Sequence, residues 1–111
     1  MRDQLGAGVL ALETATSYVV ANFGKDARQV LAGSVPFLKL LGIVAGGWQF
    51  ARGALIAGRR LREGAGDAAY YEARIITARF FSDQVLSLAS GIAHTVVSGG
   101  PSVVALAEEQ F

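Results

Sequence analysis

The chain has no cysteine, a single histidine and few charged side chains among its 111 residues. Without cysteine it can form no disulfide, thiolate metal site or cysteine nucleophile. His94 has no second histidine to work with, which leaves little for zinc or triad chemistry. Charged residues make up 17% of the chain, whereas ordinary globular proteins carry about 25%. These absences argue against a self-contained enzyme, and we expect no catalytic, cofactor-binding or metal-binding residue in this chain.

The chain also lacks an excess of either charge. Ten basic and nine acidic residues give a formal net charge of +1. Nucleic acids and anionic membranes attract proteins through a strong positive field, which this total does not supply. Nucleic acid is therefore not expected as a partner on the basis of overall charge.

Apolar residues are abundant, at 52% of the sequence, and the mean hydropathy is +0.41. A chain of this length forms one domain and buries roughly two-thirds of its unfolded surface. The apolar excess predicts more apolar surface than one small bundle can bury. Because large exposed apolar patches mark interfaces, we expect the domain to dock on a partner and to self-associate when it is isolated.

Apolar residues recur at helical spacing along most of the chain, and no segment alternates as a half-buried strand does. The predicted fold is all-α, an antiparallel bundle of three long helices with a short helix at the C-terminus. The expected long helices are residues 3–22, 26–63 and 67–98, and the short helix is residues 101–108. Residues 1–111 are expected to form a single helical domain.

Capping and breaking residues set these bounds. Asp26 and Asp67 are expected N-caps, and the glycines of the run GAG at 64–66 end the second helix. Pro36 has no amide hydrogen, so the second helix is predicted to kink or break near it. The expected buried face of the first helix consists of Leu5, Val9, Leu12, Thr16, Val19 and Phe23. The third helix is expected to bury one unbroken stripe of Tyr71, Ile75, Ala78, Phe81, Val85, Leu88, Ile92 and Val96.

Two uncharged stretches could be taken for membrane segments. Residues 40–51 are too short, because a bilayer needs about 20 residues of helix. Residues 85–107 contain several serines, His94 and the breaker GGP at 99–101. We expect buried helices of a soluble protein and no membrane span. The N-terminal residues do not form a signal peptide, and the expected location is cytoplasmic.

Glycines inside the predicted second helix require an explanation, because each costs about 1 kcal/mol relative to alanine in a helix interior. Small residues on one face allow another helix to approach closely. The candidate docking face is made of Gly42, Gly46, Gly53 and Ala57. Three interpretations are open: tight packing inside a soluble bundle, docking of another chain or domain, and helix dimerisation in a membrane.

Arginines gather around the end of the same helix. Arg59, Arg60 and Arg62 are candidate contacts for an anion such as phosphate. Cations at a helix C-terminus also favour the helix dipole, and these side chains can equally form a solvated face. An alternative hypothesis is therefore a free-standing helical interaction module that binds nucleic acid or another protein through the basic residues of 52–79.

Three sequence blocks, in order, resemble the C-terminal region of bacterial acyl-CoA dehydrogenase-like flavoenzymes. They are VPFLKLLGIVAGGW at 35–48, GDAAYYEARIITARFF at 66–81 and ALAEEQF at 105–111. The closest group is the methylmercaptopropionyl-CoA dehydrogenase-like branch. The resemblance implies an accessory helical domain that packs on a dehydrogenase core and supports oligomerisation.

The resemblance also implies a flavin-dependent parent enzyme. Members of that family bind FAD and desaturate acyl-CoA thioesters between the α and β carbons, with a glutamate that removes the α proton. That machinery lies upstream of the region that this chain resembles, and none of it can be assigned to a position here. Whether this chain belongs to an enzyme is left open. The parent would be an acyl-CoA dehydrogenase acting on CH–CH bonds, and the segment alone is expected to be inactive.

Overall fold

The computed structural model describes residues 1–111 and is built of helices, with no strand. This confirms the all-α prediction. The α-helices are α1 (Arg2–Asn22), α2 (Ala27–Ala32), α3 (Ser34–Glu63), α4 (Ala68–Gln84), α5 (Ala89–Ser98) and α6 (Gly100–Val103). Two 3₁₀ turns complete the structure, η1 (Leu86–Leu88) and η2 (Glu108–Gln110).

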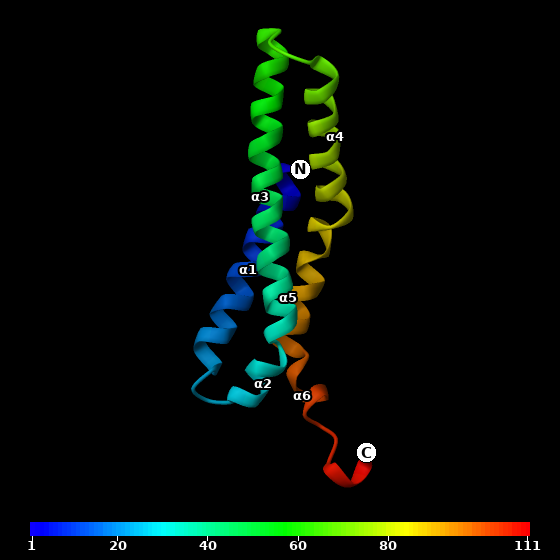
Figure 1. Ribbon diagram of the computed structural model, residues 1–111. Coiled ribbons are helices and arrows are strands. Elements are labelled where there is room, and N and C mark those ends of the chain that lie inside the picture. Colours follow the sequence, from blue (N-terminus) through cyan, green and yellow to red (C-terminus); the bar gives the residue numbers. More distant parts are fainter.

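The longest helix, α3, runs along the bundle and contacts most of the others (Figure 1). Its C-terminal half packs antiparallel to α4. Its N-terminal half packs beside α1 and α5, which both run in the opposite direction to α3. The upper half of α3 therefore has α4 as its main neighbour, whereas the lower half belongs to a three-helix bundle.

The expected caps and breaks are present. The Asp26 carboxylate accepts a hydrogen bond from the Gln29 amide at 3.3 Å, and the Asp67 carboxylate accepts one from Ala69 at 3.0 Å. Gly64 has a left-handed φ of 67°, which glycine adopts without strain. The break near Pro36 is confirmed and falls at Gly33, because proline is tolerated in the first turn of α3, where its missing amide would have no partner.

The predicted third helix is not continuous. Seven of the eight residues of the expected stripe are buried or partly buried, and Leu88 is the exception. α4 ends at Gln84, the 3₁₀ turn η1 follows, and α5 begins at Ala89. A 3₁₀ turn has fewer residues per turn than an α-helix, so it rotates the following residues relative to the stripe. Leu86 is consequently buried, with 1% of its surface exposed, whereas Leu88 is half exposed.

The predicted inner face of α1 is confirmed in part. Leu5, Leu12 and Val19 are partly buried and pack against the core, whereas the other three predicted residues are exposed. The buried residues of α1 are the small Gly8, Ala11 and Ala15, because α1 packs close to both α3 and α5. The larger Val9 and Phe23 are about half exposed. The expected C-terminal helix is shorter than predicted and ends at Val103, since α6 packs mainly on α2 and α5 and the residues beyond it lead away from the bundle (Figure 1).

The core lies where α1, α3 and α5 meet. Its buried cluster consists of Ala11, Ala15, Leu40, Ile43, Val44, Leu86, Ala89, Ala93 and Val96. In total 17 of 111 residues are buried. The molecule measures 66 × 28 × 17 Å, with a radius of gyration of 18.5 Å, whereas a compact domain of this length has about 13 Å. The fold is thus elongated and leaves much of its apolar surface in solvent.

Candidate docking surfaces

The residues of the predicted glycine face of α3 are not all in the same environment. Some pack against α4, and one faces the solvent. A Cβ at Gly46 would lie 3.1 Å from the Phe81 ring, and one at Gly53 would lie 3.6 Å from the Arg74 guanidinium. Ala57 is buried. These three residues meet α4, so tight packing within the bundle accounts for them. Gly42 has no atom within 4 Å of its Cβ position. Docking of another chain at this face stays a prediction. Gly42 is the one residue of the face that no other side chain of the bundle approaches.

A close contact that the sequence reasoning missed explains two other glycines. Leu86 inserts between α1 and α3, where a Cβ at Gly8 would lie 3.0 Å from its Cδ1 and a Cβ at Gly47 would lie 2.9 Å from its Cδ2. The absence of side chains at Gly8 and Gly47 creates the space for Leu86. The helical periodicity gave no signal for this contact, because it assigned Leu88 in place of Leu86 to the buried side.

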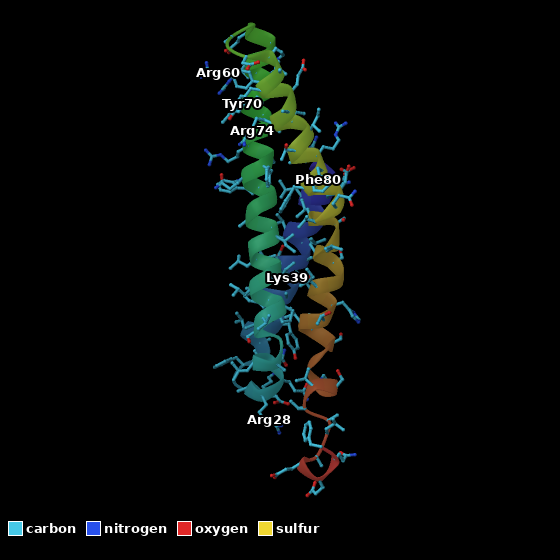
Figure 2. All side chains as sticks on the ribbon, turned by 45° about the vertical axis from the view of Figure 1, so that its right-hand side comes forward. Arg28, Lys39, Arg60, Tyr70, Arg74 and Phe80 are labelled. Carbon is cyan, nitrogen blue, oxygen red and sulfur yellow. The ribbon has the colours of Figure 1, made fainter.

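The three candidate anion-binding arginines lie at the far end of α3. Arg59, Arg60 and Arg62 are exposed there, and Figure 2 places Arg60 at the same end of the molecule as Tyr70 and Arg74 of α4. The antiparallel packing of α3 and α4 therefore brings basic side chains of both helices to one tip. Anion binding at this tip stays a prediction.

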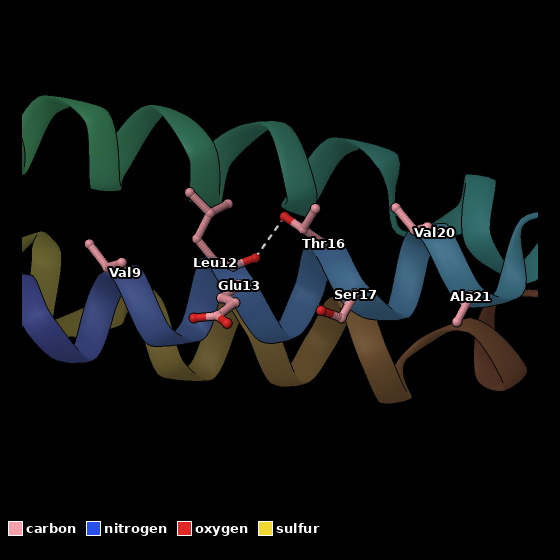
Figure 3. A pocket seen from close by; sticks show the side chains of 7 residues that line it. All are labelled: Val9, Leu12, Glu13, Thr16, Ser17, Val20 and Ala21. Carbon is pink, nitrogen blue, oxygen red and sulfur yellow. Dashed lines mark hydrogen bonds between the residues drawn. The ribbon is translucent and has the colours of Figure 1, made fainter.

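An apolar strip follows the exposed side of α1 (Figure 3). Its one charged side chain is Glu13, and Val20 is 77% exposed. The Thr16 hydroxyl donates to the Leu12 carbonyl at 2.7 Å, so this polar group is satisfied within the helix. We call this surface the α1 strip, and its residues are Val9, Leu12, Glu13, Thr16, Ser17, Val20 and Ala21.

A shallow groove lies between α1 and α5 and is lined mainly by small side chains. His94 is its one titratable group, and the Thr14 hydroxyl is already bonded to the Leu10 carbonyl at 3.0 Å. An apolar groove between two helices can receive the apolar face of a helix from a partner. We call it the α1–α5 groove, and it is lined by Ala7, Leu10, Ala11, Thr14, Ser90, Ala93, His94, Val97 and Ser98.

A third apolar surface runs along α3 on the side away from the core. We call it the outer seam of α3, and it consists of Leu38, Leu41, Ala45, Trp48, Arg52, Leu55 and Arg59, all exposed. The guanidinium carbon of Arg52 lies 5.0 Å from the centre of the Trp48 ring, within the range of a cation–π contact. α3 is also the one helix long and apolar enough to cross a membrane, a test that core helices of soluble proteins pass as well.

The structure brings together no group of three His, Asp or Glu side chains that could hold a metal ion. The Ser82 hydroxyl is buried without a hydrogen-bond partner, and it therefore lacks the hydrogen bond to a base that activates a serine nucleophile. The exposed apolar surfaces of this chain are suited to contact with other helices.

Two comparisons with known proteins match nearly the whole chain. A family model described as acetyl-CoA dehydrogenase C-terminal like matches residues 1–107. The 3-methylmercaptopropionyl-CoA dehydrogenase of Ruegeria pomeroyi is 38% identical over 102 residues. This alignment covers 92% of the chain and 17% of the relative, so the chain spans about a sixth of the length of the curated relative that it matches.

Proposed function

The chain belongs to the acetyl-CoA dehydrogenase C-terminal-like family, and from this premise we propose that it is a non-catalytic assembly domain of an FAD-dependent acyl-CoA dehydrogenase. In this role it docks on a dehydrogenase core, in the same or a partner chain, and supports oligomerisation. The resemblance to the C-terminal domain of acyl-CoA dehydrogenase-like enzymes is confirmed by both matches. The parent reaction would be the α,β-desaturation of an acyl-CoA thioester.

The observation that carries the proposal is the exposed area of the chain. Its solvent-accessible surface is 7,406 Å², whereas a compact monomer of the same mass exposes about 5,800 Å². The surplus is about 1,600 Å², and eighteen large hydrophobic side chains are exposed. Extended apolar surface of this kind is typical of a domain that is completed by a partner.

The residues of this chain do not fit FAD. A flavin dinucleotide needs a phosphate cradle of backbone amides or basic side chains beside an apolar slot. The α1 strip and the α1–α5 groove contain no basic side chain apart from His94. The two pockets that place an arginine beside apolar side chains contain Arg74 and Arg79, and their volumes of about 190 and 300 Å³ are at or below the lower end of the roughly 300–1,000 Å³ typical of ligand sites. We therefore place the flavin of the parent in its core and assign no step of the reaction to this chain.

We propose the α1 strip and the α1–α5 groove as the surface that the core covers. The two lie on the same helix, α1, and together bring Val9, Leu10 and Val20 to the solvent. Glu13 is the one formal charge on the strip, so the core can bury most of this surface without leaving charged groups unpaired.

The size and flavin content of the native protein test the docking role. An antibody against this segment is expected to detect a polypeptide larger than 11.6 kDa, or a polypeptide of this size that co-purifies with an acyl-CoA dehydrogenase carrying bound flavin. A free polypeptide of 11.6 kDa without any flavoprotein would contradict the proposal.

Val20→Asp in the native protein tests the surface. It is expected to weaken docking about tenfold or more, because a charge enters the apolar contact. The readout is protection of the domain from limited proteolysis, or retention of the flavoprotein if the two are separate chains. The matched control is Ile76→Asp on α4, a residue exposed to a similar degree that lies outside both the α1 strip and the α1–α5 groove. Equal effects of the two substitutions would contradict docking through α1.

The alternative function, nucleic-acid binding through residues 52–79, is favoured by the basic tip alone. The net charge of +1 opposes it, and the acidic Glu63, Asp67 and Glu72 lie in the same interval. We expect no retention on DNA at physiological salt. Retention that falls steeply with salt and is lost on Arg59→Ala with Arg60→Ala would instead support a nucleic-acid module.

A further inference from the structure

The outer seam of α3 has the spacing of a coiled-coil interface. Its seven residues alternate at intervals of three and four from Leu38 to Arg59, as a and d positions of a heptad do. The interval corresponds to about 32 Å of helix. Leu38 is 68% exposed, Trp48 is 50% exposed and Leu55 is 75% exposed. A helix that buries its other side in its own bundle thus presents a second, unpartnered heptad stripe to the solvent.

A second copy of α3 fits this seam when the two helices run antiparallel. In a parallel pair, Arg52 and Arg59 would each face their own copies, and like charges in register are unfavourable. α3 has one acidic residue, Glu63, and so offers no counter-charge along the seam. Antiparallel pairing instead moves the arginines of the two copies toward opposite ends.

One antiparallel register makes the seam complementary to itself. When a positions face d positions of the other copy and the two-fold axis passes between Gly46 and Gly47, Leu38 faces Leu55. In the same register the small Ala45 faces the large Trp48, and Leu41 faces the aliphatic stem of Arg52. Apolar side chains and matched volumes then fill the seam without placing two arginines together.

We propose that the chain forms a two-fold dimer with a second copy of itself through the outer seams of the two α3 helices, antiparallel and in this register. This inference rests on the assembly role proposed above. It identifies the surface through which two copies of the chain associate. The exposed surplus of about 1,600 Å² is roughly twice the 800 Å² that one partner buries in a standard interface. The exposed surplus therefore exceeds what one standard interface needs on each partner.

Single-cysteine variants test the register directly, because the chain has no cysteine of its own. Leu38→Cys and Leu55→Cys are expected to cross-link with a short bis-maleimide when the two variants are mixed. Neither should cross-link with itself, since like positions are about 25 Å apart along the helix in this register. Ile76→Cys on α4 is the matched control and should give no cross-link in any mixture. Cross-linking of Leu38→Cys with itself would overturn the antiparallel register.

Sedimentation equilibrium of the 111-residue chain tests the dimer. Trp48→Glu is expected to raise the dimer dissociation constant by at least about 30-fold, because it removes a central aromatic residue and buries a charge. Phe80→Glu on α4 is the control, since Phe80 is exposed but lies outside the seam. Circular dichroism should show the same helix content in all three proteins.

Three outcomes would overturn the dimer. They are a monomer at every concentration, an equal loss with Phe80→Glu, and binding of α3 to uncharged phospholipid vesicles in place of dimerisation. None of these outcomes concerns docking on the flavoprotein core, which is tested separately by Val20→Asp on α1. Absence of the dimer and absence of core docking are therefore distinguishable.

Discussion

Leu86→Ala is expected to lower the free energy of unfolding by about 2–5 kcal/mol, the range for truncating a buried leucine. Leu86 is 1% exposed and fills the space between Gly8 of α1 and Gly47 of α3. Neither glycine has a side chain that could move into the resulting cavity, and both belong to helices held by other contacts. The cost is therefore expected toward the upper part of the range.

The measurement is urea denaturation followed by far-ultraviolet circular dichroism, at one protein concentration because self-association shifts the apparent stability. Leu88→Ala is the matched control. It removes the same atoms two residues away, from a side chain that is half exposed, and is expected to cost less than about 1 kcal/mol. If Leu88→Ala were the more damaging of the two, the third helix would be continuous in solution and η1 would not exist.

The sequence was sufficient for the helices whose ends carry local chemical signals. Asp26, Asp67 and the left-handed Gly64 mark helix ends through bonds and dihedral angles within a few residues. Proline at position 36 likewise identified the break before α3, because its missing amide acts locally. Such features require no knowledge of the rest of the fold.

The sequence failed where close helix packing decided the outcome. The inner face of α1 was predicted from its large apolar residues, yet Gly8, Ala11 and Ala15 are buried there because small residues allow α3 and α5 to approach. The turn at η1 was missed because it depends on the contact of Leu86 with residues far away in the sequence. Periodicity can identify an amphipathic helix, but not which of two apolar faces will meet a neighbour.

The same limit applies to the candidate sites. Gly46 and Gly53 were identified as unusual because glycine in a helix is costly, but their neighbour proved to be α4 of the same chain. The outer seam of α3 was present in the sequence as a heptad, overlapped by the inward-facing residues of the same helix. The sequence does not show which of these two faces is buried in the bundle. The solvent exposure of Leu38 and Leu55 in the structure identifies the outer one.

Gly47→Leu is expected to destabilise the chain by about 3 kcal/mol or more, because overpacking a filled core forces side chains and backbone apart. A Cβ at this position would already lie 2.9 Å and 3.1 Å from the two terminal carbons of Leu86. Gly42→Leu, in the same helix, is the matched control, since no atom lies within 4 Å of its Cβ position. It is expected to stabilise the isolated chain by up to about 1 kcal/mol through helix propensity.

A double-mutant cycle of Gly47→Ala and Leu86→Ala identifies the contact itself. Gly47→Ala gains helix propensity but crowds Leu86, whereas with Leu86→Ala the new methyl group enters the vacated space. The double variant is therefore expected to be more stable than the sum of the two single changes predicts, by about 0.5–3 kcal/mol. Additive effects, measured by the same urea denaturation, would mean that Leu86 does not lie against Gly47. Because the two residues are distant in the sequence and meet only if η1 turns Leu86 toward α3, a positive coupling also establishes the break between α4 and α5.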